Sequence, residues 1–97
     1  MKMKELLSSE SKWTQQHYAT DKRGRSCSSF DPEAVCYCLL GALNKCYVND
    51  AEYDDAKRLL QKTIEKKYGL IFSIAKWNDN PERKFKEVKE ILEEANL

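Results

Sequence analysis

Three side chains in this sequence are of the types that thiol-dependent catalysis uses: Cys38, His17 and Asp79. A cysteine nucleophile needs a base beside it, and that base needs a third group to orient it. The pattern places Cys38 inside a helix, away from a helix N-terminus that would lower a thiol pKa. His17 falls on the apolar side of a predicted helix, beside Trp13. A lone histidine at such a position is more often a core residue with one hydrogen bond than a catalytic base. A small ligand-binding or thiol-dependent enzyme domain centred on these residues is therefore the alternative hypothesis.

The cysteines lack the spacing of a metal site. If Cys36 and Cys38 share a helix, their side chains diverge by about 200°, because each residue turns the helix by roughly 100°. No C-x2-C pair occurs in the chain, and it has a single histidine. Cysteines commonly act as small buried apolar residues, and reducing compartments keep them as thiols. We therefore expect no metal ion, no cofactor and four free thiols, at Cys27, Cys36, Cys38 and Cys46. Cys27 lies beside Arg23 and Arg25, so its surroundings are expected to be more electropositive than those of Cys38.

The segment from Cys36 to Leu43 reads as a buried helix that contains Gly41. Glycine inside a helix costs about 1 kcal/mol relative to alanine. Close approach of another backbone or of a bulky ring is the usual compensation. We expect the ring of Trp13 or Trp77 over this glycine, with a ligand over the same notch as the alternative.

The motif Trp77-Asn78-Asp79 precedes a proline-started helix. We expect Trp77 in the core, with its indole N–H bonded to an acceptor. Asn78 and Asp79 are expected to bond neighbouring amides and to cap the last helix, while a binding site is the alternative. The candidate binding residues are Trp13, His17, Cys38, Gly41, Trp77, Asn78 and Asp79.

Helical patterns cover most of the chain and must position these residues. Apolar residues recur at helical spacing over residues 3–20, and residues 21–30 form a polar loop. Asp31 and Pro32 suit the start of a helix, which predicts a central buried helix over residues 31–47.

Three more helices follow in the same manner. One begins at Asn49 or Asp50 and ends at Tyr68, with Gly69 as a left-handed stop. A short one covers residues 70–77, and the last begins at Asn80-Pro81-Glu82. The predicted fold class is therefore all-α: a compact single domain, residues 1–97, of about five helices around the central buried helix.

Composition excludes several classes of function. The chain has 97 residues, 41% of them hydrophobic and 34% charged, which is typical of a globular domain. Its 17 basic and 16 acidic residues give a net charge of +1, which disfavours nucleic-acid binding even though Arg23 and Arg25 form a basic loop. No stretch is apolar enough to span a membrane or to serve as a signal peptide, so a cytoplasmic location is expected.

The chain resembles a family of small bacterial and phage-associated proteins, domain of unknown function 6197. The resemblance covers nearly the whole chain and is carried by short motifs: Trp13, Tyr18-Ala19, Gly24, Cys38-Leu39-Leu40-Gly41-Ala42-Leu43, Ile74-Ala75-Lys76-Trp77-Asn78-Asp79, Glu87-Val88 and Ile91-Leu92. It implies a compact helical domain with no known activity, so no catalytic residue is carried over. Cys27, Cys36 and Cys46 lie outside the pattern.

The function predicted from these observations is a non-enzymatic protein-interaction module. The chain shows no convergent acid, base, metal or phosphate set, and a small domain can act as an inhibitor or adaptor without a pocket. The partner is expected to be a host protein or a second copy of the chain, and the gene to belong to a phage or mobile element.

Overall fold

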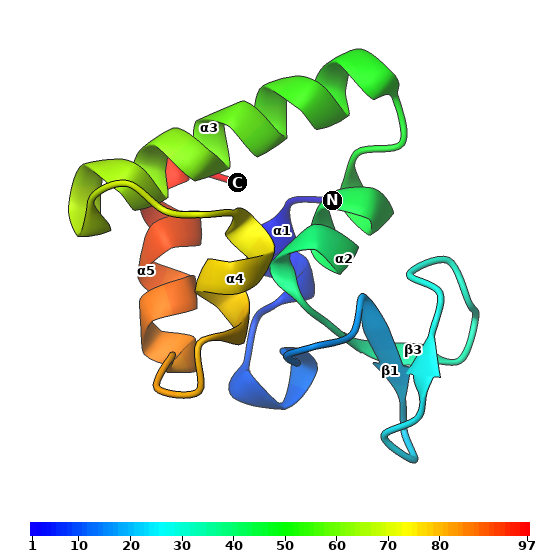
Figure 1. Ribbon diagram of the computed structural model, residues 1–97. Helices are drawn as coiled ribbons and strands as arrows, with labels where there is room; N and C mark the ends of the chain where they lie inside the picture. The colour runs from blue at the N-terminus through cyan, green and yellow to red at the C-terminus, as the bar shows by residue number, and fades with distance from the viewer.

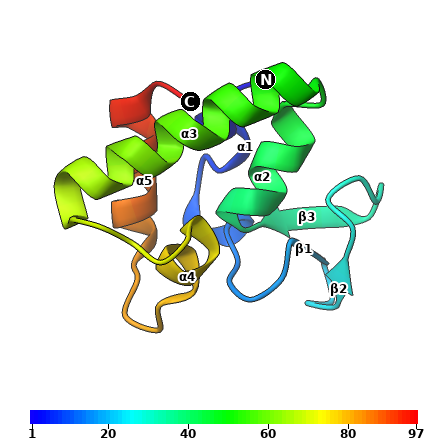
Figure 2. The same ribbon diagram turned by 45° about the horizontal axis from the view of Figure 1, so that its top comes forward.

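The computed structural model describes residues 1–97, and it contains a sheet as well as helices. The sheet has three antiparallel strands in the order β2-β1-β3, built from β1 (Ala19–Asp21), β2 (Ser26–Cys27) and β3 (Ala34–Tyr37). Figures 1 and 2 show it at one side of the helices. The prediction of an all-α bundle is therefore wrong, and the protein is mixed α and β.

The helices form the larger part of the molecule. They are α1 (Met3–Leu6), α2 (Leu39–Cys46), α3 (Asp50–Tyr68), α4 (Ile74–Asp79) and α5 (Phe85–Ala95), with one 3-10 turn at Glu10–Lys12. Helix α2 contacts α1, α3 and α4, and α3 crosses α5 (Figure 1). The helix that the sequence placed at the centre does lie there, but it is shorter than predicted.

The predicted helix 31–47 is two elements in the structure. Residues 34–37 form β3, in which Tyr37 pairs with Ala19 of β1, and α2 begins only at Leu39. Asp31 accepts a hydrogen bond from the Glu33 N–H at 2.8 Å, so its carboxylate stabilises a turn and not a helix end. The local helix-start signal lost to strand pairing with a distant segment, which no helical pattern reports.

The predicted helix 3–20 is also largely absent. Only α1 and the 3-10 turn are helical, and β1 is the central strand, buried along its whole length. The polar loop 21–30 contains β2 and a tight turn, in which Asp21 accepts hydrogen bonds from the Arg23 and Arg25 N–H groups. Gly24 has a φ of 78° in this turn, a conformation that favours glycine.

The predicted bounds of α3 are confirmed. Asn49 caps its start by accepting from the Ala51 and Glu52 N–H groups, and Gly69 ends it with a φ of 86°. Helix α4 begins four residues later than predicted. Helix α5 begins at Phe85 and not near Asn80, whose side chain stabilises the preceding turn by accepting from the Glu82 N–H.

The hydrophobic core lies between the helices. Five fully buried side chains fill the crossing of α3 and α5: Leu60, Ile64, Val88, Ile91 and Leu92. The two ends of the chain meet, because the Lys4 N–H donates to the Leu97 carbonyl at 3.3 Å. No helix combines the length and the hydropathy that spanning a bilayer requires.

Candidate functional site: a pocket beside a polar junction

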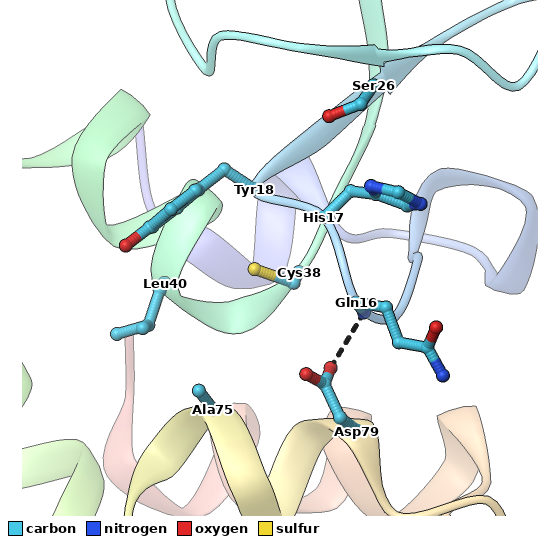
Figure 3. A pocket seen from close by; sticks show the side chains of 8 residues that line it. All are labelled: Gln16, His17, Tyr18, Ser26, Cys38, Leu40, Ala75 and Asp79. Carbon is cyan, nitrogen blue, oxygen red and sulfur yellow. Dashed lines mark hydrogen bonds between the residues drawn. The ribbon is translucent and has the colours of Figure 1, made fainter.

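A pocket of about 250 Å³ lies where the segment before β1 meets α2 and α4 (Figure 3). It is lined by Gln16, His17, Tyr18, Ser26, Cys38, Leu40, Ala75 and Asp79. The fold thus brings together the three residues of the thiol-dependent hypothesis, although they lie far apart in the sequence. Whether they can act together depends on the contact that each side chain makes.

Cys38 is the N-cap of α2, and the expectation that it lies inside a helix is wrong. Its Sγ accepts a hydrogen bond from the Gly41 N–H at 3.3 Å. Burial raises the pKa of the Cys38 thiol, the N–H groups of Gly41 and Leu40 oppose that rise, and the Asp79 carboxylate adds to it. The net direction is upward, so this thiol stays protonated at neutral pH.

His17 and Asp79 do not activate the thiol in this geometry. His17 is exposed in a loop, not on an apolar helix face, and Figure 3 shows its ring directed away from the sulfur of Cys38. The Oδ1 atom of Asp79 accepts from the Gln16 N–H at 2.8 Å and from the Asn78 side chain at 2.9 Å. A nucleophile and its base must be within hydrogen-bond reach, and no hydrogen bond joins these three residues.

Asn78 is the centre of a buried hydrogen-bond network, which we call the polar junction. Its Oδ1 accepts from the Trp13 indole N–H at 2.9 Å and from the Leu39 backbone N–H at 3.1 Å. Its Nδ2 donates to the Thr14 carbonyl at 3.2 Å and to Asp79. With 1% of its surface exposed, Asn78 joins α4 to two distant segments. The prediction that it caps the last helix is wrong.

Gln15 and Gln16 complete the polar junction, and sequence analysis missed both. The Gln15 Nε2 donates to the carbonyls of Asn78 and Asn80, each at 2.8 Å. Gln16 has a φ of 68°, which is unusual for a residue other than glycine, and its bond to Asp79 stabilises that conformation. The sequence offers no local signal for these roles, because all the partners lie more than sixty residues away.

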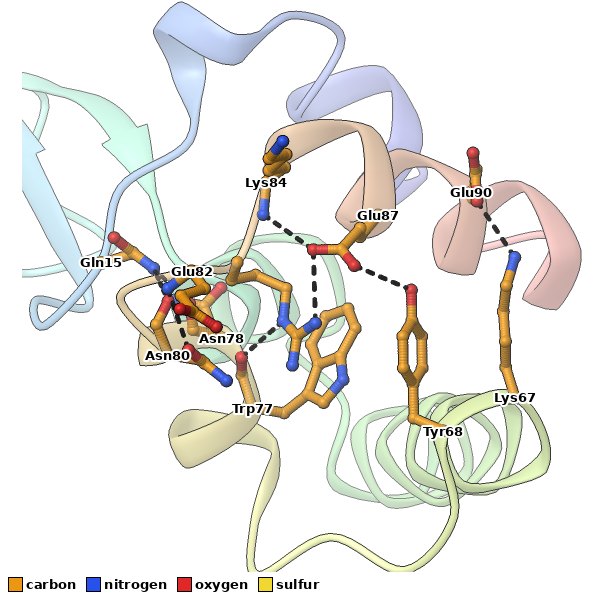
Figure 4. A network of polar contacts seen from close by, with 11 residues as sticks. Gln15, Lys67, Tyr68, Trp77, Asn78, Asn80, Glu82, Lys84, Glu87 and Glu90 are labelled. Atoms are coloured by element: carbon orange, nitrogen blue, oxygen red, sulfur yellow. Dashed lines mark hydrogen bonds and ion pairs between the residues drawn. The ribbon is translucent and has the colours of Figure 1, made fainter.

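Trp77 is buried as predicted, but its surroundings differ from the prediction. The guanidinium of Arg83 lies 3.8 Å from the ring centroid, and the ring of Tyr68 packs edge-on at 5.3 Å. Arg83 also donates to the Trp77 carbonyl at 2.9 Å and to Glu87 at 3.3 Å (Figure 4). The Trp77 indole N–H has no hydrogen-bond partner, so the bond predicted for it is absent. The indole N–H of Trp13 is the one that donates, to Asn78.

Gly41 faces a backbone carbonyl and not an aromatic ring. A Cβ at this position would collide with the Tyr18 carbonyl oxygen, which accepts from the Cys38 N–H at 3.2 Å. The predicted ring of Trp13 or Trp77 is therefore wrong, and the close neighbour of Gly41 is backbone. The same carbonyl occupies the notch in which a ligand was the alternative.

The other cysteines correct two further premises. All four are free thiols, and Cys36 lies in β3, so it shares no helix with Cys38. Burial raises the pKa of the Cys27 thiol and the carboxylates of Asp31 and Asp21 add to the rise, so its surroundings are not electropositive. No three metal-ligating side chains come together anywhere in the chain.

The chain matches the model of a family of unknown function, DUF6197, over residues 1–96, and it belongs to that family. The resemblance noted in the sequence is therefore confirmed. No curated protein and no solved structure matches the chain.

Proposed function

We propose that the protein is a non-enzymatic interaction domain that binds a partner protein through the loop between α3 and α4. Leu70 and Phe72 in this loop are 93% and 90% exposed, more than any other large apolar side chain of the molecule. Exposed apolar side chains that cluster are typical of interaction sites. This exposure is the observation that carries the proposal.

The loop is anchored so that these two side chains project from a fixed frame. Ile71, between them, packs against the hydrophobic core. Tyr68 contacts Trp77 at one end of the loop, and at the other end Ser73 caps α4 by accepting from the Lys76 N–H at 3.1 Å. An anchored loop loses little conformational entropy on binding, which favours recognition.

A basic side chain beside Phe72 indicates the chemistry of the partner. The Lys76 ammonium lies 5.9 Å from the centroid of the Phe72 ring. Complementary charge gives specificity and fast association. The partner is thus a protein surface with an apolar groove and an acidic rim.

Site-directed photocrosslinking tests this proposal. A photoreactive phenylalanine at position 72 is compared with the same residue at position 30, where Phe30 is 58% exposed and remote in sequence. We expect one protein from the cells that express the chain to crosslink at position 72 only, and L70S to abolish that product. Equal crosslinking at both positions, or none at position 72, contradicts the proposal.

A ligand-binding or thiol-dependent domain is the second candidate, favoured by the shared lining of His17, Cys38 and Asp79 in one pocket. The variant C27S/C36S/C46S leaves a single thiol whose alkylation rate can be followed against pH. Because the pKa of Cys38 is raised, we expect alkylation to keep accelerating above the free-cysteine value of about 8.5. A plateau below that pH would favour the enzyme.

A further inference from the structure

One flank of α3 carries a stripe of charge that is ordered along the helix. Glu52, Asp55, Leu59, Lys62 and Lys66 follow a spacing of three, four, three and four residues, which places them on one side of the helix. All five are exposed, and Leu59 is 44% exposed at the centre. We call these five residues the α3 stripe.

The order of charges in the α3 stripe is inverted about Leu59. Glu52 and Lys66 lie seven residues before and after it, and Asp55 and Lys62 lie four before and three after. When two copies of the stripe meet antiparallel, each acid faces a base and the two leucines meet at the centre. A parallel pairing would oppose like charges, so the charges select the antiparallel direction.

A groove beside the acidic half of the stripe offers apolar surface to a second copy. It has a volume of about 460 Å³ and is lined by Tyr47, Glu52, Asp55, Ala56, Leu59 and Leu97. Four of its six lining residues are hydrophobic, and the carboxylates of Glu52 and Asp55 are exposed. This suits lysine side chains, which place an apolar stem on such a surface and a charged head at the edge.

We propose that the protein forms a two-fold symmetric dimer in which the α3 stripes of two copies pack antiparallel. Glu52 then pairs with Lys66 of the second copy, and Asp55 with its Lys62, each contact occurring twice. Such an interface uses the same patch on both copies and closes at two, without further assembly. From Glu52 to Lys66 the contact extends about 21 Å along the helix, at about 1.5 Å per residue.

Contacts within one chain leave the α3 stripe available. Asp55 lies 3.7 Å from Arg58, but both side chains are well exposed, and such surface pairs contribute little to stability. The stripe does not include Leu70 or Phe72, so the dimer and the proposed partner site are independent. Because the pairs are exposed, the dimer is expected to weaken as salt is added.

Sedimentation velocity with charge-reversed variants tests the dimer. We expect the mass of the unchanged protein to rise from 11.3 kDa towards twice that value between about 10 µM and about 1 mM, a range typical of weak interfaces. E52K/D55K has an all-basic stripe and K62E/K66E an all-acidic one, so each alone should stay monomeric. An equimolar mixture should form a heterodimer, because every opposed pair then carries opposite charges.

The control D50K/D54K makes the same change in charge on the same helix but outside the α3 stripe, and it should dimerise like the unchanged protein. Circular dichroism confirms that each variant is folded. A protein that stays monomeric throughout the range overturns the proposal, as does a dimer that both stripe variants retain. A mixture that stays monomeric overturns the pairing of opposite charges between the two α3 stripes. None of these results bears on the proposed partner site at Phe72, which photocrosslinking tests separately.

Discussion

Two buried regions of this molecule are held together by different forces. At the crossing of α3 and α5 (Figure 1), fully buried aliphatic side chains such as Leu60 and Ile91 belong to the hydrophobic core. At the polar junction, Asn78 is buried to the same degree but makes four hydrogen bonds to groups of Trp13, Thr14, Leu39 and Asp79. The first region depends on volume, and the second on which atom donates and which accepts.

This difference sets the tolerance of each region to change. Apolar packing has no direction, so a substitution that conserves volume keeps most of its free energy. A buried hydrogen bond depends on both partners, and a buried donor or acceptor left alone costs more than the bond contributes. Small changes of shape are therefore expected to matter little at the crossing, and small changes of polarity to matter greatly at the junction.

The largest effect is expected for N78D, which keeps the shape of the side chain. The new carboxylate cannot donate to the Thr14 carbonyl, and it lies beside the carboxylate of Asp79. We expect a loss of about 3 kcal/mol in the free energy of unfolding at pH 7, since a buried charge is left beside a like charge. Urea unfolding at pH 7 and at pH 4 measures it, and the loss should shrink at pH 4, where the new group is protonated.

The matched change at the apolar crossing is L60M, which also conserves volume. It should cost less than about 1.5 kcal/mol and show no dependence on pH. Equal losses for N78D and L60M at pH 7 would refute the distinction between the two regions.

A smaller effect is expected for G41A, which tests how closely the Tyr18 carbonyl packs on α2. The added methyl group would meet the Tyr18 carbonyl, and the gain in helix propensity of about 1 kcal/mol does not offset the clash. We expect a net loss of about 2 kcal/mol in urea unfolding, as for other overpacked sites.

G24A is the control for G41A. A Cβ at position 24 would meet no other atom within 4 Å, so only the φ of 78° is unfavourable for alanine there. It should cost about 1 kcal/mol. A G41A protein as stable as the unchanged one would mean that Tyr18 and α2 are not in close contact in solution.

The smallest effect is expected at Glu87 of α5, a partly exposed carboxylate that belongs to neither region. The backbone N–H of Lys84 holds the pKa of Glu87 below its ordinary value, and Arg83 lowers it further. A pKa lowered by folding contributes stability above the unfolded value of about 4.3, and this stability is lost as the pH falls through the folded value. The difference in unfolding free energy between the unchanged protein and E87Q should therefore vanish at acid pH.

E94Q, at an exposed carboxylate of the same helix, provides the comparison for E87Q. It should change stability little at any pH. A Glu87 contribution that is the same at pH 3 and pH 7 would contradict the stated cause.

The accuracy of the sequence predictions follows the same division. The caps at Asn49 and Gly69 were predicted correctly, because each depends on residues within one or two turns. The sheet was missed, because strands of two to four residues carry too short a pattern and their pairing partners are distant. Asp31-Pro32 gave a valid local signal that strand pairing overrode.

The candidate site was predictable only as a set of residues. The sequence singled out Cys38, His17 and Asp79, and the fold does place all three around one pocket. The sequence pattern wrongly placed Cys38 inside a helix. In the structure the Cys38 N–H donates to the Tyr18 carbonyl of a distant segment, and α2 begins at the next residue. Gln15 and Gln16 were missed, since their partners lie at the other end of the chain.

By itself, the sequence determined which segments become the long helices and which of their faces are buried, because helical periodicity and caps act over a few residues. Only the tertiary structure decided that Asn78 holds three segments together and that residues 34–37 form a strand. It also decided that Leu70 and Phe72 project outward. These outcomes depend on contacts between segments far apart in the chain, and their free energy exists only when the whole molecule is folded.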